Sequence, residues 1–147
     1  MNKYFILCLA FVLSLAMTSL GIAKDYNYIS PQEFKARLDA GDVEQGKLMV
    51  FSSQNLKEFA SGYLPIAIQT FARPLESEAD YRKLDIVLDR AKVTSEDIVV
   101  ICPRGGSGAT RPYDYLQKNG IDPSRMFILT KGQEAYNKAF PGDVVKP

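Results

Sequence analysis

One of the two cysteines of the chain, Cys102, lies at the start of a glycine-rich loop, and this combination could carry out nucleophilic chemistry. The loop directly follows the aliphatic run 98–101 and reads Cys102-Pro103-Arg104-Gly105-Gly106-Ser107-Gly108. Glycines allow a backbone to curl so that successive N–H groups point to one place and bind an anion. A helix that begins after the loop would add partial positive charge. We therefore expect a cysteine with a lowered pKa that is largely thiolate.

The composition limits the chemistry in which this cysteine could take part. The chain has 147 residues, of which 46% are hydrophobic and 24% are charged, so we expect one globular domain. It contains no histidine, which excludes Ser-His-Asp triads, Cys-His dyads and histidine-ligated metals. Two cysteines exclude a cysteine-rich metal site, and we expect neither a metal nor a cofactor. A formal net charge of +1 gives no electrostatic reason to expect a nucleic-acid partner.

Residues 1–23 have the features of a secretory signal peptide. A short basic start precedes an almost wholly apolar run over residues 4–16, and Gly21-Ile22-Ala23 provides the small residues of a cleavage site. Because the run is shorter than the ~20 residues that span a bilayer, we expect cleavage and no stable membrane span. Residues 24–147 would then form a periplasmic or secreted domain. Its one thiol, Cys102, would lie in a compartment that favours disulfides, which indicates a reactive or intermolecularly paired cysteine.

Short aliphatic runs alternate with helical patterns along residues 24–147, and these elements must position the loop. Ser30-Pro31-Gln32-Glu33 predicts a capped helix start, and Gly41 ends that helix. Further helices are expected at residues 56–60, 76–91, 109–119 and 134–140. Strands are expected at residues 48–51, 98–101 and 126–129, with a weaker one at 67–68. Pro112 fits its helix only in the first turn. The alternation predicts an α/β domain with a mostly parallel sheet, and the cysteine loop lies where such folds bind ligands.

Four segments of the chain resemble the rhodanese family of sulfurtransferases. They are residues 29–34 (ISPQEF), Glu58-Phe59 with residues 62–68 (GYLPIAI), residues 98–108 with the cysteine loop, and residues 129–136 with Gly132. The resemblance covers most of residues 24–147. It implies a rhodanese-like three-layer fold, in which a mostly parallel five-stranded sheet is flanked by helices. It also implies that a cysteine accepts a sulfane sulfur, becomes a persulfide, and passes the sulfur to a thiophilic acceptor.

The loop residues receive the following roles. Cys102 would be the nucleophile and persulfide carrier, and the backbone amides of Arg104, Gly105, Gly106, Ser107 and Gly108 would form the anion cradle. The Arg104 side chain would steer anionic donors, and the Ser107 hydroxyl would hydrogen-bond the thiolate. The expected partners are a small sulfur-containing anion or a persulfide as donor and a thiol as acceptor. A protein partner is also compatible with this interpretation.

Two of the arginines outside the cradle lie at positions 73 and 111. Arg73 follows a segment that often borders the active site in the rhodanese family. Arg111 is expected to have a structural role, paired with Asp114 or another carboxylate.

Departures from the family pattern keep other functions open. The common loop is C-x-x-G-x-R-[ST], but Ser107 stands in place of the arginine and Gly108 in place of the serine or threonine. Ser52 and Gln54 replace a D-x-R motif. These changes favour a non-catalytic rhodanese-fold binding module in an envelope complex as the alternative function. A phosphatase or arsenate reductase would need C-x5-R, and position 108 is glycine. A thiol redox protein would need a second cysteine in a C-x-x-C motif, and this chain has Gly105 at that position.

Overall fold

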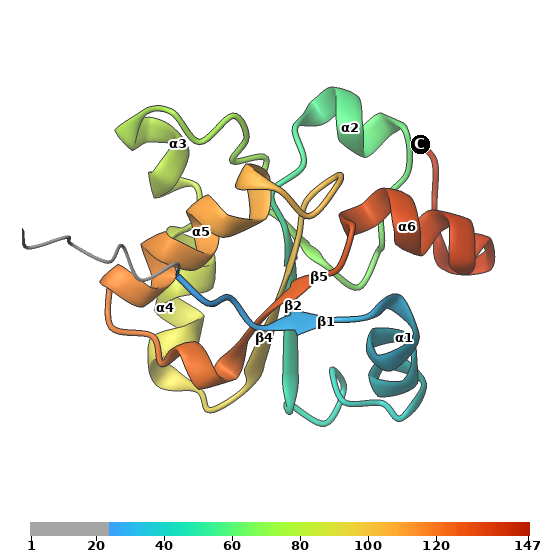
Figure 1. Ribbon diagram of the computed structural model, residues 1–147, viewed down its shortest axis with the longest axis horizontal. Helices are drawn as coiled ribbons and strands as arrows, with labels where there is room; N and C mark the ends of the chain where they lie inside the picture. Colours follow the sequence, from blue (N-terminus) through green and yellow to red (C-terminus); the bar gives the residue numbers. More distant parts are fainter. Residues whose placement is uncertain (1–23) are drawn as a thin grey trace, which may run out of the picture.

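A five-stranded, entirely parallel sheet forms the centre of the molecule. The computed structural model describes residues 24–147, so the predicted signal peptide lies outside the described residues. The strand order is β1-β5-β4-β2-β3 (Figure 1). The bounds are Tyr28–Ile29 for β1, Leu48–Ser52 for β2, Ile68–Gln69 for β3, Asp97–Ile101 for β4 and Met126–Leu129 for β5. Sequence analysis missed only the two-residue β1, which pairs with β5 through Tyr28 and Ile29.

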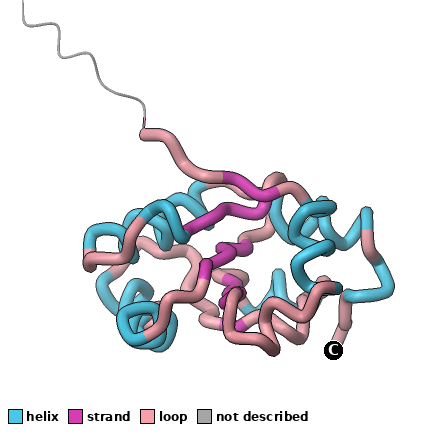
Figure 2. Tube along the Cα trace, turned by 90° about the horizontal axis from the view of Figure 1, so that it is seen from below, coloured by secondary structure: helices cyan, strands magenta, loops and turns pink. Residues whose placement is uncertain are grey.

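Helices cover both faces of the sheet, which makes the three layers predicted from the sequence (Figures 1 and 2). One side carries α3 (Glu78–Arg82), α4 (Asp85–Val93) and α5 (Ser107–Lys118), and the other carries α1 (Pro31–Asp39), α2 (Leu56–Ala60) and α6 (Gly132–Ala139). Two short 3₁₀ helices, η1 (Pro123–Arg125) and η2 (Pro141–Asp143), complete the described chain. No helix among residues 24–147 is long and apolar enough to cross a membrane.

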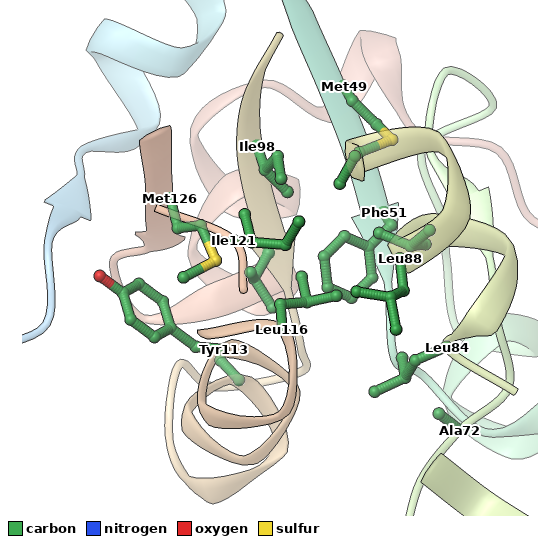
Figure 3. Close-up of a cluster of buried hydrophobic side chains, with 14 of the residues drawn as sticks. Met49, Phe51, Ala72, Leu84, Leu88, Ile98, Tyr113, Leu116, Ile121 and Met126 are labelled. Atoms are coloured by element: carbon green, nitrogen blue, oxygen red, sulfur yellow. The ribbon is translucent and has the colours of Figure 1, made fainter. Parts of the chain in front are cut away.

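Alternating side chains of the central strands divide the core into two clusters. Met49 and Phe51 of β2 face α4 and α5, whereas Leu48 and Val50 face α1 and α6. Figure 3 shows the α4–α5 cluster, to which Phe51 contributes together with Leu84 and Leu88. The same alternation along β4 puts Ile98, Val100 and then Cys102 on the α4–α5 side.

The capping box predicted at the start of α1 is confirmed, and α2 begins with a capping box that was not predicted. Ser30 and Glu33 form a capping box at the start of α1, and Asn55 and Glu58 form another at the start of α2. In each case the polar side chain satisfies an N–H group that has no partner within the helix. The second capping box also orients the Glu58 carboxylate, because Oε2 accepts the Asn55 N–H group at 2.9 Å.

The prediction of one helix over residues 76–91 was wrong, because the structure has two helices there. Ser77 caps α3 with a capping box, and α3 has no buried residue. The backbone tightens between the two helices, where Leu84 N–H donates to Tyr81 O at 2.9 Å and Val87 N–H donates to Leu84 O at 3.0 Å. These i→i−3 bonds turn the chain so that Leu84 enters the core while α3 stays on the surface.

Candidate functional site

Cys102 follows the last residue of β4, and its sulfur lies at the centre of the glycine-rich loop. The Gly105 N–H group donates to Sγ at 3.0 Å, and the amides of Arg104 and Gly106 also donate toward the sulfur. Gly105 has a φ of +75°, a conformation that glycine adopts at little cost. Of the five residues expected to form the cradle, three direct their backbone amides toward the sulfur.

The expectation that Cys102 has a lowered pKa was wrong. Its residue surface is only 1% exposed, and this burial raises the pKa of the thiol above its ordinary value. The three loop amides and the positive charge of Arg73 act in the opposite direction, but desolvation of the thiolate outweighs them. The loop is an anion cradle by geometry, yet the resting residue at neutral pH is the thiol.

This balance predicts the pH dependence of Cys102 alkylation. We expect iodoacetamide to modify Cys102 of the folded protein more slowly at neutral pH than it modifies a free thiol. Because a raised pKa postpones ionisation, the rate should continue to rise above pH ~8.5, the pKa of an unperturbed cysteine. The measurement is the rate at which the Cys102 peptide gains the label as the pH is raised. The prediction would be contradicted if the pH at which the alkylation rate reaches half its maximum were at or below the value for glutathione.

The start of α6 holds the cysteine loop in place. The N–H groups of Gln133 and Glu134 donate to the carbonyls of Cys102 and Pro103 at 2.8 and 3.0 Å. Gly132 has a φ of +63° and packs directly on the loop backbone. A Cβ there would lie 2.6 Å from the Arg104 nitrogen and closer still to the Cys102 carbonyl oxygen. A side chain at position 132 is therefore incompatible with this loop conformation.

Ser53 connects the segments that follow three strands, a role that sequence analysis missed. Its backbone N–H donates to Ile101 O at 2.9 Å, and its carbonyl accepts the Arg73 N–H at 3.0 Å. Its buried hydroxyl donates to Gly108 O at 2.6 Å. These bonds join the end of β4, the segment after β3 and the first turn of α5.

Ser53 also explains why Pro112 is tolerated inside α5, where the sequence had predicted it only in the first turn. The helix begins at Ser107, two residues earlier than expected, so Pro112 lies within it. Proline has no N–H group to donate to the carbonyl four residues earlier, which is that of Gly108. The Ser53 hydroxyl satisfies this carbonyl instead. The sequence shows that the Gly108 carbonyl needs another donor, because Pro112 lies four residues later. It does not show that Ser53 is this donor.

Arg73, from the segment after β3, is the charged side chain that lies against the cysteine loop. The position that a Cβ would take on Gly108 is 2.8 Å from Arg73 Nη1 and 3.2 Å from Cys102 Cβ. Arg73 Nη2 forms an ion pair with Glu58 Oε1 at 3.3 Å. The expectation that Arg73 borders the site therefore agrees with its position.

The other predicted side chains lie farther from the sulfur. Arg104 is exposed and lines an open pocket of about 610 Å³ together with Lys131, Glu134 and Lys138. Ser107 is exposed as the first residue of α5, and its hydroxyl forms no hydrogen bond to the Cys102 sulfur within the described residues.

The partners of Arg111 differ from the expected pairing with Asp114 or another carboxylate. Its Nη1 donates to the carbonyls of Pro74 and Leu75 at 3.1 and 3.4 Å. Asp114 instead accepts from Lys24 and from the Tyr26 hydroxyl. Arg111 thus keeps a structural role, with backbone carbonyls as its partners.

Comparisons with known proteins identify the fold. No model of a protein family matches the sequence, and no curated protein matches it. Among solved structures, a yeast protein tyrosine phosphatase of the rhodanese family is similar with a TM-score of 0.61 and 14% identity, over 82% of this chain and 90% of that chain. An As-Sb reductase from Leishmania major has a TM-score of 0.60 and 22% identity, over 80% and 81% of the two chains.

A third similar structure is a rhodanese-related protein from Thermoplasma volcanium. It has a TM-score of 0.56 and 18% identity, over 83% of this chain and all of that chain. Together with the parallel five-stranded sheet and its two helical layers, these similarities place residues 24–147 in the rhodanese-like fold.

Proposed function

We propose that this protein is an exported sulfurtransferase of the rhodanese type, which carries sulfane sulfur as a persulfide on Cys102. The observation that carries the proposal is the position of the Cys102 sulfur at the focus of the Arg104, Gly105 and Gly106 amides. Preorganised N–H donors of this kind stabilise negative charge on a reacting atom without reorganisation during the reaction. Both the cysteine thiolate and the persulfide formed from it are anions that such a cradle stabilises.

The proposed reaction has two nucleophilic steps. First, Cys102 loses its proton to hydroxide or water, and the thiolate attacks the outer sulfur of a donor such as thiosulfate. The new S–S bond forms the persulfide, the S–S bond of the donor breaks, and sulfite leaves with the electron pair. An acceptor thiolate then attacks the outer sulfur of the persulfide. The electron pair of that S–S bond returns to the Cys102 sulfur, which the loop amides hold in place.

The burial of Cys102 favours a second candidate function, a non-catalytic binding module with the rhodanese-like fold. A cysteine that is 1% exposed, with its pKa raised by burial, is also what an inert core cysteine would show. In this alternative, the loop is a structural turn held by α6. The two functions differ in whether Cys102 gains a sulfur atom.

Intact mass spectrometry of the purified protein distinguishes the two functions. The protein is incubated separately with thiosulfate and with an organic persulfide. We expect the mass to increase by one sulfur atom, and we expect cyanide or dithiothreitol to reverse the increase. Cys102→Ala should show no such gain. The absence of an adduct with either donor, together with resistance of Cys102 to alkylation, would contradict sulfur transfer and favour the binding module.

Export is part of this proposal and has its own readout. The composition of residues 1–23 supports a cleavable signal peptide with a cut after Ala23. The N-terminal sequence of the protein recovered from the periplasm or the medium should therefore begin at Lys24. Recovery of the intact N-terminus would contradict cleavage.

A further inference from the structure

The Arg73 side chain occupies space that the side chain of any residue other than glycine at position 108 would enter. A Cβ on Gly108 would lie 2.8 Å from Arg73 Nη1 and 3.2 Å from its Cδ. A distance of 2.8 Å is shorter than real side chains tolerate, so the arginine would have to move. The guanidinium can therefore lie beside the cysteine loop because position 108 has no side chain.

Arg73 also lies close to the cysteine itself. The same point on Gly108 is 3.2 Å from Cys102 Cβ, so the separation of Nη1 and Cys102 Cβ cannot exceed the sum of these two short distances. At such a separation, in a site shielded from water, a unit positive charge acts strongly on a neighbouring anion. The positive charge of Arg73 accordingly lowers the pKa of Cys102, against the larger effect of burial.

The hydrogen bonds of Arg73 are incomplete. Its Nε is buried and has no hydrogen-bond acceptor among residues 24–147. The one ion pair that Arg73 forms within the described residues runs from Nη2 to Glu58 Oε1 at 3.3 Å, while Glu58 Oε2 accepts the Asn55 N–H group. The Arg73 side chain is 26% exposed, but its buried Nε donor is left unsatisfied, which is unfavourable. An oxyanion with two oxygens can accept from Nε and an Nη group together.

We propose that Arg73 is the anion-recognition residue of the Cys102 site and makes it selective for anionic sulfur donors over neutral ones. Arg73 supplies, from the segment after β3, the positive charge that position 107 of the loop does not provide. The Glu58 carboxylate pairs with Nη2 and competes with the oxyanion of a donor for the guanidinium. This inference rests on the proposed sulfur transfer, but its test does not require sulfur transfer to occur.

The test compares two alkylating reagents that differ in charge. Iodoacetate is anionic and iodoacetamide is neutral, and both react with the same thiolate. The ratio of their rates at Cys102 therefore reports how the site treats an anion, independently of the pKa of the thiol. The rates are measured at one alkaline pH from the labelling of the Cys102 peptide. We expect Arg73→Gln to lower this ratio about tenfold, the size expected for loss of a unit charge at this separation.

Three variants serve as comparisons. Arg82→Gln removes an equal charge from the exposed surface of α3, where Arg82 pairs with Glu78, and should leave the ratio within about twofold of the wild type. Gly108→Ala should lower the ratio as Arg73→Gln does, because a Cβ displaces the arginine. Glu58→Gln should raise the ratio, since it frees the guanidinium and keeps an oxygen acceptor for the Asn55 N–H group.

Two results would overturn the proposal. One is an unchanged ratio in both Arg73→Gln and Glu58→Gln, with thermal melting showing that Glu58→Gln is folded. The other is a fall in Arg104→Gln as large as that in Arg73→Gln, which would assign anion recognition to the exposed loop arginine. The sulfur-transfer proposal fails separately, because wild-type protein that gains no sulfur could still show the Arg73-dependent ratio. Conversely, a persulfide with no dependence on Arg73 would contradict only the present inference.

Discussion

Replacing Gly132 with alanine should displace the cysteine loop and lower the free energy of unfolding by about 3 kcal/mol or more. The residue has a φ of +63°, and its missing Cβ would lie 2.6 Å from the Arg104 nitrogen. The obstructing atoms belong to the backbone, so rotation of a side chain cannot relieve the contact. Moving the loop breaks the two hydrogen bonds that α6 donates to the carbonyls of Cys102 and Pro103.

Chemical denaturation and alkylation of Cys102 test this expectation together. Gly132→Ala should lower the denaturation midpoint and should also change the iodoacetamide rate, because the amides no longer point at the sulfur. Gly142→Ala is the matched control, since nothing lies within 4 Å of the Cβ that it adds. If the two variants had the same midpoint and both kept the wild-type alkylation rate, α6 would not be what holds the loop.

Replacing Phe51 with alanine should have the largest effect on stability in the α4–α5 core. Phe51 lies on β2 opposite Ile68 of β3 and Val100 of β4, and it is 0% exposed. Figure 3 shows its ring among core side chains that include Leu84 and Leu88. Truncation removes the buried ring and leaves a cavity that the neighbouring strands cannot close. Such changes cost about 3–5 kcal/mol, a large part of the stability of a typical domain.

Thermal unfolding measures this loss. We expect Phe51→Ala to melt about 10 °C or more below the wild type. Ile86→Ala on α4 is the matched control, because Ile86 is 62% exposed and its truncation should change stability by less than about 0.5 kcal/mol. Equal melting temperatures for the two variants would show that Phe51 does not contribute to a tightly packed core.

Local interactions explain how far the sequence alone predicts this protein. The capping boxes Ser30–Glu33 and Asn55–Glu58 join residues only three apart, so their helices could be recognised directly. The aliphatic runs of β2, β4 and β5 identify buried parallel strands by composition. The glycine spacing after Cys102 predicts a cradle of amides because the loop forms within a few residues. The break between α3 and α4 was missed because the burial of Leu84, which redirects the chain, depends on the rest of the core.

The electrostatics of the site were decided by the tertiary structure. Whether the Cys102 pKa rises or falls depends on desolvation by the packed core against three local amides, and only the folded chain sets that balance. Arg73 and Gly132 are distant from the cysteine in sequence, and the sheet brings both to its loop. Ser53 donates to the Gly108 carbonyl, for which Pro112 has no N–H group, although the two residues are 55 positions apart in the sequence. The sequence by itself therefore determined the buried strands β2, β4 and β5, the cap of α1 and the position of the cysteine loop, whereas long-range packing determined which charges and donors surround the sulfur.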